Sequence, residues 1–285
     1  MLDLHRILRL KDGRNLGWGQ YGDPEGKAVF FFHGTPGSRM MRHPDISIAE
    51  DMGIRVITSD RPGFGLSTPK PHRTLLDWPE DVIELADSLG IDRFAVVGFS
   101  GGGPQAAACA YKIPERLTSV TLVSSLPPHD LRSSLNSMPL VIRILFAAAR
   151  HASWGLRPLV NPIVHVVRRH FDFYYEQAAA KLVPADRELF LRHDIRNIFR
   201  ESLGEAFQQG NNGFLTELKI HMRPWGFHLQ DLSTKIFLWH GELDQFDDGR
   251  ALREAIPGSH AISLPTEGHL VFFRHWPEIL AQLVL

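Results

Sequence analysis

The chain has 285 residues, of which 44% are hydrophobic and 22% charged, and its net charge is −1. This composition is typical of a globular protein, and the near-zero charge gives no indication of a nucleic acid or a strongly anionic surface as partner. The length is long for one compact core and short for two ordinary domains, which favours a single α/β domain with a large insertion.

The first half of the chain alternates between strand and helix patterns. Residues 8–18 predict a hairpin that turns at Asp12-Gly13. Short apolar runs without alternation then predict strands that are buried on both faces of a parallel sheet. These runs cover residues 29–32, 54–58, 94–97 and 120–123.

Helices are predicted between these strands. Asp77 and Glu80 resemble a capping box, and the apolar stripe that follows them ends at Gly90. A second helix is expected from about Gly101 toward Tyr111, with a proline in its first turn.

After residue 125 the pattern changes. Residues 126–230 contain no convincing strand, and apolar stripes within 141–148 and 160–167 have helical spacing. Residues 131–230 carry a net charge of +5 (13 Lys and Arg against 8 Asp and Glu), whereas the rest of the chain carries −6. Strand patterns return at 235–240 and 261–264, and a helical pattern covers 276–283.

These elements predict an α/β fold with a doubly wound, mostly parallel sheet. Residues 1–125 and 231–285 should form the core, and residues 126–230 should form an inserted all-helical cap, or lid, subdomain.

The strongest local motif is Gly98-Phe99-Ser100-Gly101-Gly102, which matches the pattern G-x-S-x-G. Such a serine lies on a strained strand-to-helix turn, and small residues two positions before and after it let strand and helix come close. The amino terminus of the following helix favours negative charge that develops at the serine. The apolar strand before the motif and the helix after it indicate a nucleophile rather than an ordinary glycine-rich turn.

Five motifs together resemble the α/β-hydrolase superfamily, in its serine esterase-like branch with a helical cap. They are HGTPGS (33–38), DRPGFGLS (60–67), GFSGGG (98–103), WHGELD (239–244) and EGH (267–269). The resemblance implies that the nucleophile, the acid and the histidine follow one another in this order along the chain.

This order selects His269 as the general base, because it directly follows the last predicted strand. His260 precedes that strand and lies on the wrong side of the sheet. His33 and His240 each precede a glycine at a strand end, where structural hydrogen bonding is expected.

The acid must come from a loop that carries a carboxylate. The segment after 120–123 offers none, and the family pattern His-Gly-x-x-Asp in the later loop points to Asp244. Glu242 should lie too close to the strand end, and Asp247 and Asp248 should begin the next helix as caps.

Two backbone N–H groups should bind the oxyanion. Gly101, which follows the nucleophile, supplies one. In HGTPG the resemblance favours Thr35 for the other, since Pro36 has no N–H. The alternative is that HGTPG is only a tight turn.

Other conspicuous residues predict structure rather than chemistry. Asp60 should brace its loop, and Cys109 should be a packed thiol. The arginines of residues 131–230 should mostly form a solvated face, and the weaker interpretation is a patch that meets an anionic substrate or a membrane surface. Aromatic residues of the cap should be mostly core, with some lining an acyl pocket: Trp154, Phe171, Phe173, Tyr174, Tyr175 and Phe207.

These residues predict a serine hydrolase that cleaves small apolar carboxylic esters through an acyl-enzyme, without a metal or an organic cofactor. Serine at the turn argues against haloalkane dehalogenases and epoxide hydrolases, which use aspartate there. Proline iminopeptidases usually show HGGPG and GGSWGG, and carbon–carbon bond hydrolases often carry an aromatic where Leu270 stands. Both remain alternatives, as does a non-catalytic ligand receptor on the same fold. The oligomeric state stays open.

The single cysteine, Cys109, excludes an intrachain disulfide and favours a reducing, cytoplasmic location. The first residues show no long apolar core and no cleavage site, so no signal peptide is expected. No uncharged apolar run is long enough for a transmembrane helix, since arginines interrupt the best candidate at residues 139–167.

Overall fold

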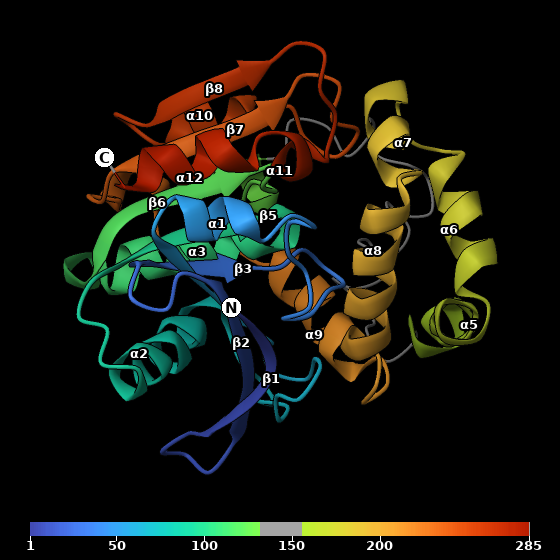
Figure 1. Ribbon diagram of the computed structural model, residues 1–285, viewed down its shortest axis with the longest axis horizontal. Helices are drawn as coiled ribbons and strands as arrows, with labels where there is room; N and C mark the ends of the chain where they lie inside the picture. The colour runs from blue at the N-terminus through green and yellow to red at the C-terminus, as the bar shows by residue number, and fades with distance from the viewer. Residues whose placement is uncertain (132–155, 285) are drawn as a thin grey trace.

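The sheet is the frame of the molecule in the computed structural model, which describes residues 1–131 and 156–284 (Figure 1). Its eight strands are ordered β1-β2-β4-β3-β5-β6-β7-β8. The strands are β1 (Leu2–Arg9), β2 (Asn15–Gly22), β3 (Lys27–Phe32), β4 (Ile54–Ser59), β5 (Phe94–Phe99), β6 (Leu117–Val123), β7 (Ile236–Gly241) and β8 (His260–Leu264). Strand β2 runs antiparallel to both β1 and β4, and the pairs from β4 to β8 are parallel. The predicted, mostly parallel sheet is confirmed.

Helices cover both faces of this sheet. Successive side chains of a strand point to opposite faces, and in β3 Phe31 joins one buried cluster while Phe30 joins the other. Phe31 lies with α1 (Ser47–Asp51), α11 (Val271–Arg274) and α12 (Trp276–Val284). Phe30 lies with α2 (Trp78–Ser88), α3 (Gly103–Lys112) and α10 (Arg250–Ala255). Burial on both sides explains why the strands are apolar without alternation.

Two local predictions are modified by the structure. The predicted hairpin is formed by β1 and β2, but its connection spans residues 10–14, with Gly13 at a φ of +85°. The capping box is made by Thr74 and Asp77 rather than by Asp77 and Glu80. Asp77 accepts hydrogen bonds from the backbone N and the hydroxyl of Thr74 at 2.7 Å, so its carboxylate serves the preceding turn.

The described residues between β6 and β7 form helices and connecting loops, and none of them forms a strand. Its helices are α5 (Arg157–Arg169), α6 (Phe171–Ala179), α7 (Pro184–Phe190), α8 (His193–Ala206) and α9 (Asn212–His221), with short 3₁₀ turns at His129–Leu131 and Leu229–Asp231. Helices α5 to α8 stand to one side of the sheet, and α9 lies closer to it (Figure 1). The predicted stripe within 141–148 falls outside the described residues, and the division into core and cap subdomains stays a prediction.

The apolar faces of these helices are largely buried. In α5, Val160, Val164 and Val167 are buried, whereas Ile163 is 39% exposed. Among the cap aromatics, Phe171, Tyr175 and Phe207 are buried and Tyr174 is partly buried, Phe173 is exposed, and Trp154 lies outside the described residues.

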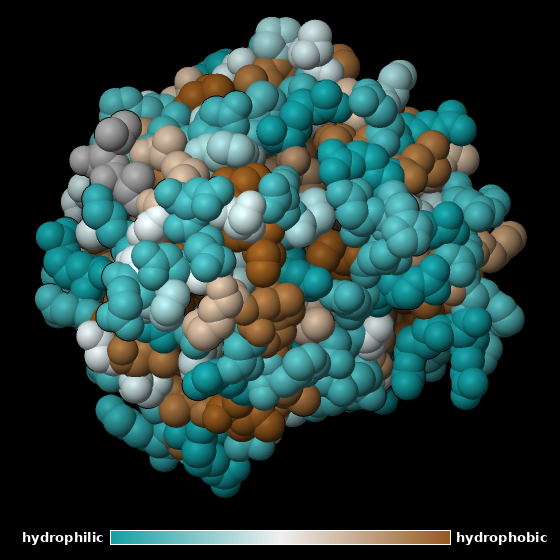
Figure 2. All heavy atoms as spheres, viewed as in Figure 1, coloured by the Kyte–Doolittle hydropathy of each residue, from teal (hydrophilic) through white to brown (hydrophobic). Residues whose placement is uncertain are grey.

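The outer surface is mixed in character. The face drawn in Figure 2 is mostly hydrophilic, with hydrophobic residues in small groups. Within residues 1–131 and 156–284, no helix is both long and apolar enough to cross a membrane.

Candidate active site

Ser100 occupies the sharp turn between β5 and the helix that follows it. A short 3₁₀ turn, Ser100–Gly102, leads directly into α3. Ser100 has a φ of +53°, in the left-handed region that a residue with a side chain rarely adopts. Such strain at a strand-to-helix turn is the geometry that the G-x-S-x-G motif demands, because it holds the hydroxyl above the end of the sheet.

The glycines around Ser100 are required by close packing. A Cβ on Gly98 would lie 2.8 Å from the Cβ of Ala106 in α3. A Cβ on Gly102 would lie 2.7 Å from the carbonyl oxygen of His33. Strand, helix and neighbouring loop therefore meet at this turn with room only for hydrogen atoms.

The structure brings Ser100, His269 and Asp244 into one hydrogen-bonded chain. Nε2 of His269 lies 2.9 Å from Oγ of Ser100, and Nδ1 of His269 lies 2.7 Å from Oδ2 of Asp244. The three residues follow β5, β8 and β7, whose carboxyl ends meet at one edge because these strands are parallel. With Nδ1–H donating to Asp244, Nε2 is free to accept the hydroxyl proton of Ser100.

The other acidic residues of the β7 loop bind elsewhere. Glu242 accepts a hydrogen bond from the Ser263 hydroxyl. Asp247 and Asp248 accept from backbone N–H groups two residues further on, in the turn before α10. Asp244 uses its second oxygen to accept from the N–H of Phe246 at 2.8 Å, which fixes the orientation of its carboxylate.

The surroundings of His269 favour its protonated form. Burial by itself lowers the pKa of an imidazole, but here the negative charge and hydrogen bond of Asp244, together with the charge of Asp186, outweigh burial and raise the pKa of His269. The ring also lies between the aromatic rings of Phe99 and Phe246, whose centroids are 5.5 and 4.7 Å away.

Thr35 and Gly101, the two residues expected to bind the oxyanion, lie side by side. The reason is topological: β3 and β5 are parallel neighbours, so the loop after Phe32 reaches the turn at Ser100. A Cβ on Gly101 would lie 2.7 Å from the Cβ of Thr35, and a Cβ on Gly34 would lie 3.3 Å from that of Ser100. Their function as oxyanion donors stays a prediction.

Asp186 is a site residue that the sequence did not reveal. It lies in α7, and its carboxylate accepts the backbone N–H groups of His269 and Leu270 at 2.7 and 2.8 Å. Burial raises the pKa of Asp186, while these two hydrogen bonds act in the opposite direction. An aspartate in the first turn of a helix has an ordinary explanation as a partner of the helix dipole, so its sequence position gave no signal.

The remaining conspicuous residues have structural partners. His33 Nδ1 donates to the carbonyl oxygen of Gly34, and His240 Nε2 lies 3.1 Å from that of Ser125. Burial lowers the pKa of both imidazoles. Asp60 braces its loop by accepting from the N–H groups of Arg39 and Leu66, and Cys109 is fully buried.

In the described parts of the chain, no group of three or more His, Cys, Asp or Glu side chains is arranged to hold a metal ion.

Comparison with known proteins places the chain in a family. A family model described as alpha/beta hydrolase fold matches residues 27–275, and the chain therefore belongs to this family. A solved structure of a hydrolase from Pseudomonas aeruginosa PA01 superposes with a TM-score of 0.71 at 18% identity, covering 98% of this chain and 96% of that one.

Curated relatives match over part of their length. The chain is 35% identical over 127 residues to a proline iminopeptidase of Xylella fastidiosa, covering 41% of this chain and 38% of the relative. It is 32% identical over 146 residues to a non-heme chloroperoxidase of Streptomyces lividans, covering 50% and 53%. The matched part thus spans about half or less of these relatives.

Proposed function

We propose that this protein is a serine hydrolase that cleaves carboxylic esters through an acyl-enzyme intermediate. The observation that carries the proposal is the continuous hydrogen-bonded chain from Ser100 through His269 to Asp244, with distances of 2.9 and 2.7 Å. Nucleophilic catalysis of this kind requires a nucleophile and a base within hydrogen-bond reach, and a third group that orients the base.

In the first half-reaction Oγ of Ser100 attacks the ester carbonyl carbon while Nε2 of His269 takes the hydroxyl proton. The imidazolium that forms is stabilised by Asp244, whose charge raises the pKa of His269. The tetrahedral intermediate then expels the alkoxide, which receives the proton from Nε2, and the acyl group stays on Ser100.

In the second half-reaction water takes the place of the alcohol. His269 accepts a proton from water as its oxygen attacks the acyl carbon, and returns that proton to Oγ of Ser100 as the acid leaves. In both halves the oxyanion would accept hydrogen bonds from the N–H groups of Thr35 and Gly101. Their adjacency to each other and to Ser100 supports this assignment.

The proposed substrates are esters with small to medium apolar acyl groups. The aromatic rings of Phe99 and Phe246 beside His269 support an apolar surrounding for the reacting ester. The single buried cysteine is the basis for proposing a cytoplasmic location.

A proline iminopeptidase activity is the second candidate. The 35% identity to the Xylella fastidiosa enzyme favours it, although the match covers 38% of that protein. The same Ser-His-Asp chemistry would then cleave an amide rather than an ester.

The test combines active-site labelling with a substrate panel. A fluorophosphonate should add to Ser100 of the wild type, detected by intact mass, and not to Ser100→Ala. This variant should fold and lose about 10⁴–10⁶-fold in kcat. Rates on p-nitrophenyl esters of rising acyl length and on proline p-nitroanilide separate the two candidates.

Two results would reject the ester assignment. One is a preference for the proline amide over every ester, and the other is an Ser100→Ala variant with more than about a tenth of the wild-type rate. Absence of labelling in the folded wild type would instead favour a non-catalytic binding protein.

A further inference from the structure

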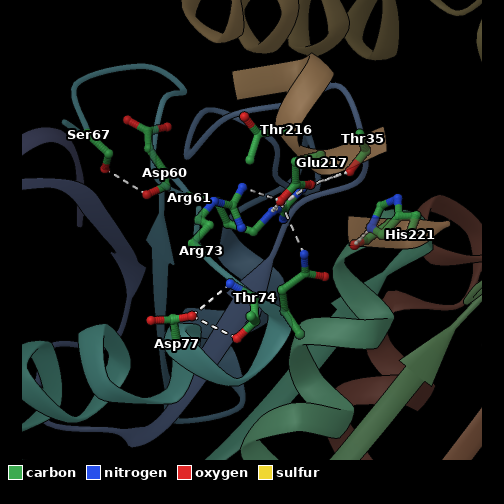
Figure 3. A network of polar contacts seen from close by, with 12 residues as sticks. Thr35, Asp60, Arg61, Ser67, Arg73, Thr74, Asp77, Thr216, Glu217 and His221 are labelled. Carbon is green, nitrogen blue, oxygen red and sulfur yellow. Dashed lines mark hydrogen bonds and ion pairs between the residues drawn. The ribbon is translucent and has the colours of Figure 1, made fainter. Parts of the chain in front are cut away.

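Helix α9 presents two buried polar side chains to the two loops that carry the proposed oxyanion donors. Glu217 and His221 are four residues apart and therefore lie on the same face of the helix. Glu217 accepts a hydrogen bond from the hydroxyl of Thr35 at 2.7 Å, and Nε2 of His221 lies 3.2 Å from the carbonyl oxygen of Gly101. Figure 3 shows both residues reaching from α9 toward these loops.

Glu217 is held as a charged group in the interior. Its side chain is fully buried, and it accepts hydrogen bonds from Arg61 at 2.7–3.0 Å, from Arg73 at 2.8 Å and from the amide of Gln105 at 3.2 Å. Burial tends to raise the pKa of Glu217, but the charges of Arg61 and Arg73 outweigh burial and hold this pKa well below its usual range. Glu217 is thus a permanent acceptor for Thr35.

Arg61 completes the support of the same loop. Nη1 of Arg61 donates to the carbonyl oxygen of His33 at 2.6 Å, and Nη2 donates to that of Gly34 at 3.1 Å and to the Thr35 hydroxyl at 2.9 Å. The Arg61–Glu217 pair therefore binds three consecutive residues before Pro36. Figure 3 shows this pair beside Thr35.

The charge of this cluster suits an oxyanion nearby. A lone buried carboxylate beside the oxyanion would repel the negative charge that develops there. Arg61 and Arg73 together outweigh the charge of Glu217, so its carboxylate can hold Thr35 without that cost.

We propose that Glu217 and His221 are positioning residues for the oxyanion hole, so that α9 sets the spacing between the backbone N–H groups of Thr35 and Gly101. This inference rests on the proposed function. Oxyanion donors act within a narrow range of distances, about 2.7–3.1 Å, and loss of one donor costs about 10²–10³ in kcat. Misplacement of a donor should therefore lower kcat more than it changes KM.

The test compares variants on either side of the Glu217–Thr35 hydrogen bond. Glu217→Gln removes the charge. Thr35→Val removes the hydroxyl and keeps the backbone N–H. It therefore tests the positioning function of this hydrogen bond even if Glu217→Gln does not fold. Glu201→Gln is the control, since it breaks another ion pair between the cap segment and the core, with Arg42, seven residues beyond Thr35 in the chain.

Each variant is measured for kcat and KM on an ester, for the rate of fluorophosphonate labelling, and for affinity toward a trifluoromethyl ketone that forms a tetrahedral adduct. We expect Glu217→Gln and Thr35→Val to lose about 10- to 100-fold in kcat and in ketone affinity, with KM changed less than about threefold. Thr35→Ser, which restores the hydroxyl, should recover most of that loss. Glu201→Gln should match the wild type.

If Glu217 and Thr35 only stabilised the fold, their substitution would lower the melting temperature and leave kcat and ketone affinity at the wild-type level. If folded Glu217→Gln and Thr35→Val keep kcat and ketone affinity within about threefold of wild type while Ser100 is still labelled, the positioning inference is wrong and the proposed function stands. If the folded wild type is neither labelled nor active on any ester, the proposed function fails, and this inference with it.

Discussion

Buried carboxylates lie on two sides of Ser100: the base side, at His269, and the oxyanion side, at the loops of Thr35 and Gly101. The two sets differ in whether arginines pair with them. On the base side, Asp244 and Asp186 face His269, and within the described residues neither forms an ion pair with Lys or Arg. On the oxyanion side, Glu217 is paired with both Arg61 and Arg73.

This difference matches the charges that the proposed mechanism would create on each side. A cationic imidazolium would form on the base side, where uncompensated negative charge is favourable and raises the pKa of His269. Negative charge would develop on the oxyanion side, where a carboxylate is favourable only when cations compensate it. Under the proposal, buried carboxylates thus raise proton affinity on one side and hold geometry on the other.

Breaking the base side should have the largest effect. Asp244→Asn should preserve the fold and lower kcat by roughly 10⁴, because the amide favours the wrong tautomer of His269. Steady-state kinetics on a p-nitrophenyl ester, with circular dichroism as a check on folding, measures this loss.

The neighbouring aspartates serve as controls for Asp244. Asp247→Asn and Asp248→Asn should each cost less than about tenfold in kcat, because both residues accept hydrogen bonds within their own turn. An active Asp244→Asn beside a crippled Asp247→Asn or Asp248→Asn would show that the acid is misassigned.

On the oxyanion side, substitution of Glu217 should clearly lower the free energy of unfolding. Glu217→Gln leaves Arg61 and Arg73 buried without a counter-charge, and removal of one partner from a buried ion pair costs about 3–5 kcal/mol. Urea unfolding followed by tryptophan fluorescence measures this change.

The ion pair of Arg42 with the exposed Glu201 gives the comparison for stability. Glu201 is 42% exposed, so Glu201→Gln should cost no more than about 1 kcal/mol. If Glu217→Gln and Glu201→Gln lowered the free energy of unfolding equally, burial would not explain the contribution of Glu217.

Substitution of Asp186 should have a weaker effect, which appears in the pH dependence of activity. The proposed mechanism needs neutral His269, so activity should fall as pH decreases through the raised pKa of this residue. Asp186→Asn removes one of the charges that raise this pKa, so the acidic limb of the kcat/KM profile should move to lower pH.

The direction of that shift is decisive. A profile that moves to higher pH, or does not move, would mean that the charge of Asp186 does not act on His269. Glu188→Gln, an exposed change in the same helix, is the control and should leave the profile in place.

The frame of the fold and the three residues of the hydrogen-bonded chain could be predicted from the amino-acid sequence. Apolar runs without alternation predicted strands covered on both faces, and the glycines around Ser100 predicted the sharp turn that the structure contains. The chain order also selected Asp244 and His269, which the structure brings together with Ser100. These features are readable because short motifs at the carboxyl ends of neighbouring parallel strands must converge at one edge.

The residues that support that site could be found in the three-dimensional structure but not in the sequence. Asp186, Glu217 and His221 contact residues that are 83, 182 and 120 positions away in the chain. In sequence they stand within helical patterns, where an acidic residue or a histidine is ordinarily solvated. Their contacts depend on how α7 packs against the loop after β8 and how α9 packs against the loops after β3 and β5. Contacts over such separations leave no local pattern in the sequence. The helical spacing of these polar residues would be the same if their side chains were exposed.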